Sequence, residues 1–386
     1  MTFIDTLLIV PHKIIPFIAG LAGVGFVIAF HEFGHFIFCK IFNIKTPSFS
    51  IGFGPRLLTK KIGETEFAIS AIPLGGYVEI AGAAEVGQGE QVDAKNTDER
   101  SFVAKPWIQK FLVMSGGIVF NIILAYVTFS LLYMTGMPKS MILYPKNATA
   151  TVSAILPGSP AEIAGIQPGD MILEIDQTSL KKPFGPALVK KIFASPDQPL
   201  TLLINRNGTT QEIQLTTKSQ NFLGETIGSA GIYFETTAMP SYSFIESIKK
   251  GIRLTHEHMY NTVKLLRHAF SKKDSSMVAG PIRIIAETFN GAQQGLSTLL
   301  LFLAIISISL AMINLLPLPI LDGGQIVFYT IEAIIGRSIP DKVREYIHIA
   351  CWILFLIFFL YLSYKDIARL IHPYTETILN LLGLKK

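Results

Sequence analysis

Hydrophobic and polar positions alternate along this chain on the scale of whole segments. Four long apolar stretches are each near the length that crosses a hydrocarbon core of ~30 Å, namely residues 17–41, 108–137, 296–316 and 347–364. The polar segment between the second and third stretches is too long for a simple connection, so it predicts an extramembrane domain with connectors. Half of the 386 residues are hydrophobic, which is typical of an integral membrane protein. The pattern predicts a polytopic α-helical membrane protein with four transmembrane helices.

The distribution of positive charge orients these predicted helices. The tail before the first helix has only Lys13, whereas the segment from Lys40 to Lys110 is rich in Lys and Arg. Because cytoplasmic loops carry the excess of Lys and Arg, this favours an outside N-terminus and a cytoplasmic first loop. The C-terminal Lys and Arg residues disagree mildly, but the first helices usually dominate. The polar domain is then extracytoplasmic, and the first and third helices end in the cytoplasmic half of the membrane.

The first apolar stretch carries two histidines and a glutamate, His31, Glu32 and His35, in the pattern His-Glu-x-x-His. Four residues make just over one helical turn, so both imidazoles project from one face and can hold a single metal ion. Two imidazoles make zinc the best candidate. Glu32 is placed to take a proton from a water at the metal. Ionisable groups at membrane depth are costly and usually mark function, and the alternative is two interfacial histidines hydrogen-bonded to neighbouring helices.

A third ligand is predicted where the third apolar stretch ends, in the sequence Asn314-Leu-Leu-Pro-Leu-Pro-Ile-Leu-Asp322-Gly-Gly. Two prolines in three residues cannot continue a regular helix, so the chain unwinds there. Asp322 then emerges at the depth of the two histidines. Two His and one carboxylate leave the fourth zinc position open, which is the arrangement of catalytic zinc. The alternative is an ordinary Asp-Gly-Gly turn at a helix exit.

Together, HEFGH in an apolar helix and NLLPLPILDGG at the end of a later one resemble the site-2 protease family of intramembrane zinc metalloproteases. The nearest branch is the bacterial regulator-of-sigma-E type that carries a PDZ domain. The resemblance implies that His31, His35 and Asp322 bind Zn²⁺, that Glu32 is the catalytic acid/base, and that Asn314 holds the substrate backbone. It also implies a multi-pass protein of the bacterial inner membrane. Its substrates would be transmembrane segments of single-pass proteins, such as an anti-sigma factor or remnant signal peptides.

Residues 49–78 have an imperfect alternation punctuated by glycine and proline, which predicts a β-hairpin. The run resembles the family's membrane-re-entrant hairpin on the cytoplasmic side, whose edge can pair with an unwound substrate strand. An ordinary cytoplasmic hairpin remains the alternative. In the second apolar stretch, glycines 116 and 117 favour close helix packing. Asn121 is either a helix-to-helix hydrogen bond or a functional group.

Residues 148–218 resemble an inserted α/β domain of the PDZ class, with strands broken by Pro-Gly turns, a helix over 183–193 and a hairpin at 205–208. Residues 242–270 have the helical spacing and basic charge of an amphipathic helix, lying either on the membrane surface or packed on a neighbour. The predicted domains are a first part of the membrane protease core (1–137), the PDZ domain (148–218), a linker with the amphipathic helix (219–295) and a second part of the core (296–386).

Two other function classes compete with an intramembrane protease. One is a catalytically idle membrane scaffold in which the PDZ domain recruits partners, but a structural zinc usually has four protein ligands and three are evident here. The other is a membrane-anchored metalloprotease acting on non-membrane substrates. The predicted partners are transmembrane substrates and the lipid bilayer. Nucleic acid is excluded because no basic run is interleaved with aromatics. His348 is interpreted as structural.

Overall fold

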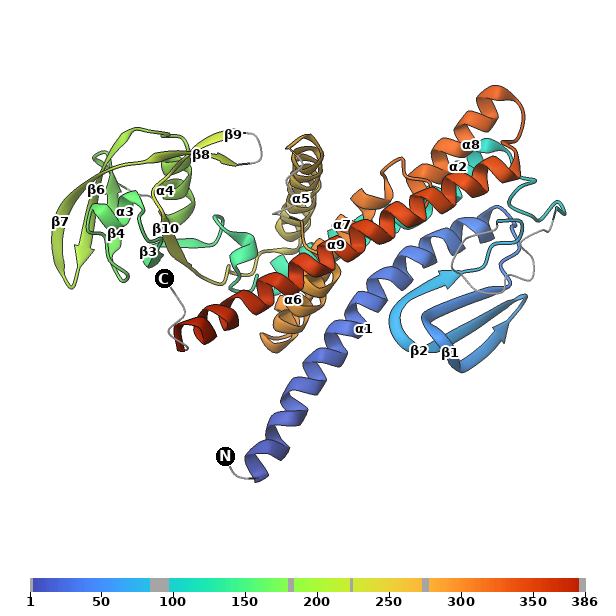
Figure 1. Ribbon diagram of the computed structural model, residues 1–386, viewed down its shortest axis with the longest axis horizontal. Coiled ribbons are helices and arrows are strands. Elements are labelled where there is room, and N and C mark those ends of the chain that lie inside the picture. Colours follow the sequence, from blue (N-terminus) through green and yellow to red (C-terminus); the bar gives the residue numbers. More distant parts are fainter. Residues whose placement is uncertain (1–2, 84–96, 180–183, 223–224, 273–277, 382–386) are drawn as a thin grey trace. The chain divides into compact units, whose positions relative to one another are not determined.

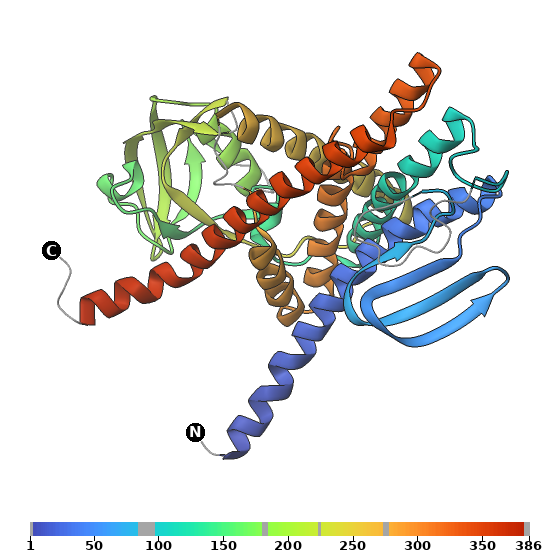
Figure 2. The same ribbon diagram turned by 45° about the vertical axis from the view of Figure 1, so that its right-hand side comes forward.

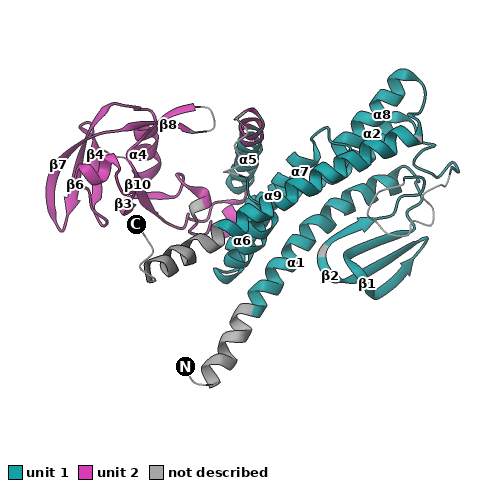
Figure 3. Ribbon diagram, viewed as in Figure 1, with its two compact units in different colours: residues 1–131, 245–263, 274–386 teal, residues 132–244, 264–273 magenta. Residues whose placement is uncertain are grey.

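The computed structural model describes residues 3–83, 97–179, 184–222, 225–272 and 278–381. The chain divides into two compact units, which are described separately (Figure 3). Unit 1 comprises residues 1–131, 245–263 and 274–386, and unit 2 comprises residues 132–244 and 264–273.

Helices form most of unit 1 (Figure 1). They are α1 (Phe3–Ile41), α2 (Trp107–Thr135), α5 (Phe244–Lys272), α6 (Pro281–Gln293), α7 (Leu296–Asn314), α8 (Asp322–Ile335) and α9 (Asp341–Leu381), of which α2 and α5 continue into unit 2. Within the described residues, four helices are long and apolar enough to cross a membrane: Ile14–Ile41, Trp107–Thr135, Leu296–Asn314 and Lys342–Ala368. The four predicted spans are therefore confirmed as apolar helices, and the predicted amphipathic helix is α5.

The surface of α9 has the character expected of a helix in contact with lipid. Leu354, Ile357 and Leu360 are all more than half exposed, and only 6% of its apolar window is buried. Exposed apolar surface on this scale is not stable in water and needs an apolar solvent or partner. This surface agrees with the prediction of a membrane protein.

The predicted hairpin is present as β1 (Ser48–Ile62) and β2 (Thr65–Val78). It lies beside α1 in both views (Figures 1 and 2), and β2 packs against that helix. The pairing is irregular, because Phe49 pairs with both Phe67 and Val78. Residues 49–51 therefore lie between two segments of β2 instead of facing one partner strand. The β1–β2 sheet is therefore compact, and its strand β2 packs against α1.

The end of α7 follows from its prolines, but what comes next differs from the sequence prediction. Helix α7 stops at Asn314, and the chain turns through Pro317 and Pro319 before a further helix, α8, starts at Asp322. The sequence pattern predicts only an unwound exit here. A Cβ on Gly324 would lie less than 3.0 Å from the carbonyl group of Leu318, so the glycine permits the tight turn into α8. Asp322 is thus the first residue of a helix, where a carboxylate is favoured by the helix dipole.

Helix α6 begins in an unusual way, because its N-terminal amides are capped by a side chain from another helix. Gly280 offers no side-chain cap. Instead the buried carboxylate of Asp366, on α9, accepts hydrogen bonds from the backbone N–H groups of Gly280 and Arg283, the latter at 2.9 Å. Because α6 also packs on α1 and α7, this cap ties the last helix to the helices around the site.

Unit 2 is an α/β domain built on an antiparallel sheet of order β10-β3-β4-β6-β7, with β5 paired to β4. Its strands and helices are β3 (Ala148–Ile155), α3 (Pro160–Ile163), β4 (Met171–Ile175), β5 (Thr178–Ser179), α4 (Phe184–Phe193), β6 (Pro199–Arg206), β7 (Thr209–Thr216), β8 (Lys218–Phe222), β9 (Glu225–Ser229) and β10 (Ile232–Thr236), with a short 3₁₀ helix at Met141–Leu143. The predicted hairpin at 205–208 joins β6 to β7. Strand β10 pairs with β3, so the sheet draws on residues beyond 218 that the sequence pattern assigns to a linker.

Candidate active site

Two helices bring the three predicted metal ligands together. His31 and His35 lie one turn apart on α1 and are each only 5% exposed, and Asp322 opens α8. The Nε2 atoms of the two histidines are 3.2 Å apart. Oδ2 of Asp322 is 3.1 Å from Nε2 of His31 and 3.5 Å from Nε2 of His35. Residues almost 300 positions apart in the chain therefore converge on one point.

The spacing of these three atoms fits a tetrahedral metal ion. Zinc bonds of ~2.0–2.1 Å place neighbouring ligand atoms of a tetrahedron about 3.3 Å apart, which lies inside the observed range of 3.1 to 3.5 Å. Nδ1 of His35 lies 2.7 Å from the backbone carbonyl oxygen of Val113. A carbonyl only accepts, so Nδ1 carries the proton and Nε2 presents a lone pair to the site. Within the described residues Oδ2 of Asp322 is a buried oxygen without a hydrogen-bond partner. The lone pairs of His35 and Asp322 therefore converge on one point, and together with His31 these atoms form a group that could hold a metal ion.

Glu32 lies beside this cluster, on the same helix. Its carboxylate is close enough to interact electrostatically with His31, His35 and Asp322, and the backbone of Val78 at the end of β2 lies close to it. The hairpin therefore borders the predicted acid/base. A carboxylate in this position can exchange a proton with a reactant at the metal site.

Asn314 and Asn121 also reach the site, both through His31. The Nδ2 atom of Asn314, in the last turn of α7, is 3.3 Å from Nε2 of His31. The Nδ2 atom of Asn121, on α2, is 3.1 Å from the opposite ring nitrogen, Nδ1. The sequence left the role of Asn121 open, and the structure places its side chain against a predicted ligand. No sequence signal points to the carbonyl of Val113, because every residue has one.

Glycines let α1 and α2 approach closely enough for these contacts. A Cβ on Gly34 or on Gly116 would lie less than 3.0 Å from the carbonyl group of the other residue. A Cβ on Gly117 would collide with the imidazole of His31. The close packing predicted for this pair of glycines on α2 is therefore present, and it has a second effect, since Gly117 makes room for a ligand ring.

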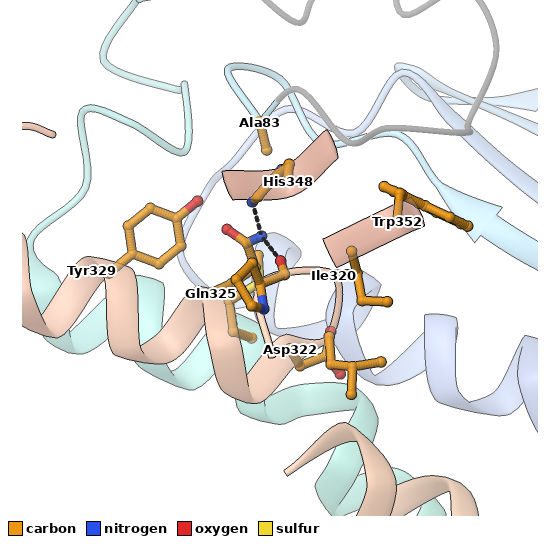
Figure 4. Close-up of a pocket in the computed structure, with 10 residues that line it drawn as sticks. Ala83, Ile320, Asp322, Gln325, Tyr329, His348 and Trp352 are labelled. Carbon is orange, nitrogen blue, oxygen red and sulfur yellow. Dashed lines mark hydrogen bonds between the residues drawn. The ribbon is translucent and has the colours of Figure 1, made fainter. Parts of the chain in front are cut away.

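A cavity of about 100 Å³ opens beside Asp322, with room for several water molecules (Figure 4). Gln325, one helical turn after Asp322, donates a hydrogen bond to the carbonyl of Pro319 at 2.7 Å. Its Nε2 atom also lies 3.1 Å from Nε2 of His348 on α9. The sequence alone does not predict a role for Gln325. The signal that could have found it is its spacing of three residues from Asp322, which places both side chains on one helix face.

Two buried histidines on an apolar helix of spanning length, together with a carboxylate at the start of α8, form a group that could hold a metal ion, as expected of a metallopeptidase in a membrane. The comparisons with known proteins agree. The sequence signature of Peptidase family M50 matches residues 19–358, and the chain belongs to this family. The predicted family and the predicted enzyme class are thereby confirmed.

Relatives from several bacteria match along nearly their whole length. A protein of Campylobacter jejuni, named as a candidate zinc metalloprotease, is 31% identical over 364 residues, which cover 92% of this chain and 94% of the relative. A Clostridium perfringens protein with the same kind of name is 32% identical, with 88% and 95% covered. The zinc metalloprotease RasP of Geobacillus kaustophilus is 26% identical, with 89% and 96% covered. These names agree with the predicted Zn²⁺ cofactor.

Among solved structures, the PDZ domain of an SdrC-like protein from Listeria monocytogenes matches 22% of this chain and 87% of its own length. The sequence identity is 16% and the TM-score is 0.20.

Proposed function

We propose that this M50 peptidase cleaves the transmembrane segments of single-pass membrane proteins, using Zn²⁺ held by His31, His35 and Asp322. The observation that carries the proposal is the convergence of three ligand atoms at tetrahedral spacing. His31 and His35 lie inside the apolar window Ile14–Ile41, with apolar residues on both sides. A peptide bond reaching these atoms must enter the hydrocarbon region.

Each side chain has a task in hydrolysis. His31, His35 and Asp322 would hold the zinc ion, which would supply the positive charge that polarises the scissile carbonyl and makes the attacking water more acidic. Glu32 accepts the proton of that water and returns it to the leaving amine. Asn314 offers carboxamide hydrogen-bonding groups beside the ligands, which suits it to hold the substrate backbone. The burial of the site strengthens these electrostatic interactions.

A transmembrane substrate must unwind before its scissile bond is accessible, because a helix satisfies its own backbone groups. The β1–β2 hairpin is the proposed source of replacement hydrogen bonds, through strand addition. Two features support this role: β2 packs on α1, the helix with both histidines, and Val78 at the end of β2 lies close to Glu32. Leu57, Leu58 and Ile72 on the hairpin are exposed apolar residues, which favours a re-entrant position in lipid.

The cellular arrangement follows from the charges of the loops. We place the protein in the bacterial inner membrane, with the active site in the cytoplasmic half of the bilayer. Unit 2 is then extracytoplasmic, and we interpret its sheet and helices as a PDZ domain that binds an extended peptide of a substrate or partner. An anti-sigma factor and remnant signal peptides are the proposed substrate classes.

The test is the substitution Glu32→Gln in the purified full chain, with a single-pass reporter in lipid vesicles and a soluble protein as alternative substrate. We expect the variant to keep its zinc, by elemental analysis, and to lose about 10²–10⁴-fold in cleavage rate. Glu287→Gln, which removes a half-exposed carboxylate on α6, is the matched control and is expected to cleave normally. Unchanged cleavage by Glu32→Gln would remove Glu32 from the mechanism. Cleavage of the soluble protein alone would overturn an intramembrane role.

A further inference from the structure

The Nδ1 atoms of the two histidines on α1 contact different groups, although both groups belong to α2. Nδ1 of His35 donates to the carbonyl of Val113, which leaves a single possible tautomer. Nδ1 of His31 faces a carboxamide, that of Asn121, at 3.1 Å. A carboxamide can donate through its nitrogen or accept through its oxygen, and the two orientations have the same shape. The tautomer of His31 therefore depends on how Asn121 is turned.

The two orientations have opposite consequences at the metal site. If Nδ2 of Asn121 donates, Nδ1 of His31 is the acceptor and the ring proton moves to Nε2. Nε2 lies 3.1 Å from Oδ2 of Asp322 and 3.2 Å from Nε2 of His35, so this proton would occupy the point where the ligand atoms converge. If Oδ1 of Asn121 accepts, the proton stays on Nδ1 and Nε2 is free. Only the second orientation leaves three lone pairs for a metal ion.

We propose that Asn121 is a positioning residue for the metal site: its carboxamide oxygen accepts the Nδ1 proton of His31 and so presents Nε2 to the metal. The proposal rests on the proposed function, in which His31 is a zinc ligand. Partners of this kind fix the tautomer and ring orientation of metal-bound histidine, and losing one typically weakens metal binding 10–100-fold.

The surroundings of Asn121 hold its side chain in this position. The residue is fully buried, so water cannot readily replace its carboxamide. Its backbone carbonyl accepts a hydrogen bond of 2.9 Å from the hydroxyl of Ser307 on α7, which fixes α2 at this level. One turn earlier, the missing side chain of Gly117 leaves room for the His31 ring against α2. Within the described residues Oδ1 of Asn121 has no hydrogen-bond partner where it lies, so turning the carboxamide by 180° breaks no other side-chain hydrogen bond and brings Oδ1 to Nδ1 of His31.

The experiment measures zinc affinity of the purified full chain in detergent, by competition with a chromophoric chelator and without any activity assay. Asn121→Leu keeps the approximate size but removes the hydrogen bond, and we expect zinc binding to weaken 10–100-fold. Asn121→Asp offers only acceptors, and we expect it to keep affinity within about threefold of wild type, since a carboxylate is also a common partner of zinc-bound histidine. Thr128→Val is the control, because it replaces a buried polar side chain two turns further along α2 that the site does not use, and it should bind zinc as wild type does.

Several outcomes would overturn the proposal. Equal zinc affinity of Asn121→Leu and wild type shows that the carboxamide is not needed. Equal losses in Asn121→Leu and Asn121→Asp show that it donates to His31. Should neither variant fold, ¹⁵N NMR of histidine-labelled wild type decides directly, because we expect Nδ1 of His31 to be protonated and a proton on Nε2 would refute the assignment. His31→Ala tests the proposed metal site separately from the role of Asn121. If this variant keeps full zinc affinity, His31 is not a zinc ligand and the proposed metal site itself is wrong.

Discussion

Gly117 is the residue of α2 at which a single added methyl group should do most damage to the metal site. A Cβ built there lies 2.5 Å from Nε2 and 2.6 Å from Nδ1 of His31. The nearest ring atom, Cε1, lies 2.4 Å away, and ordinary van der Waals contact begins near 3.4 Å. The ring of His31 in Gly117→Ala must therefore retreat by about 1.0 Å, or α2 must move away by as much. Metal–ligand distances are tolerated only within ~0.2 Å. The displacement therefore exceeds what the site can absorb.

We expect Gly117→Ala to weaken zinc binding by at least the 10–100-fold that is typical when a residue hydrogen-bonded to a metal ligand is lost. We also expect overpacking to lower the free energy of unfolding by about 1–3 kcal/mol. The assay is chelator competition for zinc on the purified full chain, with thermal unfolding measured in parallel. A shifted ligand should show a larger relative change in zinc affinity than in thermal stability.

The matched control is Gly20→Ala, the same substitution in another spanning helix. The Cβ there meets the backbone and side chain of Thr288 at 3.3 Å, which needs an adjustment of only a few tenths of an ångström. We expect zinc affinity to be unchanged. A folded Gly117→Ala protein with wild-type zinc affinity would show that the His31 ring has more freedom than the packing of α1 on α2 implies, and the reasoning would fail.

Two further predictions concern the third ligand and unit 2. Asp322→Asn removes the charged ligand and should reduce zinc content by elemental analysis more than any outer-partner variant does, and equal zinc content would reject Asp322 as a ligand. In unit 2, hydrogen bonds from Arg206 hold the pKa of the buried Asp170 below its usual range, so this pair stabilises the fold above pH ~4 and the contribution is lost as the pH falls through the lowered pKa. Arg206→Met should lower the free energy of unfolding of unit 2 at neutral pH and should lower it less in acid, measured by hydrogen exchange of the sheet amides; a loss that grows in acid would contradict this pairing.

The sequence predicts those parts of the site that lie within a single helix or turn, because the spacing of nearby residues determines their geometry. His31 and His35 share a helix, and a spacing of four residues places both rings on one face. The exit of α7 is equally local, since Pro317 and Pro319 exclude a regular helix. Asp322 required a further step, in which membrane topology limits the depths at which distant segments can meet.

Other features depend on packing that no local pattern carries. Helix α8 follows within a few residues of two prolines, and the turn that permits it depends on the contact of Gly324 with Leu318. The role of Val113 belongs to its backbone, which is invisible in residue types. Strand β10 completes the sheet of unit 2 by pairing with β3, which lies far from it in the sequence. Asn121 was recognisable as a buried polar residue, but its partner is fixed only by the approach of α2 to α1.

The near-touching backbones of α1 and α2 at Gly34 and Gly116 also bear on how the enzyme is made. A ribosome finishes both helices, and with them both histidines and their outer partners, about 200 residues before it reaches Asp322. A nascent or prematurely terminated chain therefore carries an incomplete site with two of the three proposed ligands. With the proposed ligand set, the metal site is completed only near the end of synthesis, after Asp322 has been added to the chain.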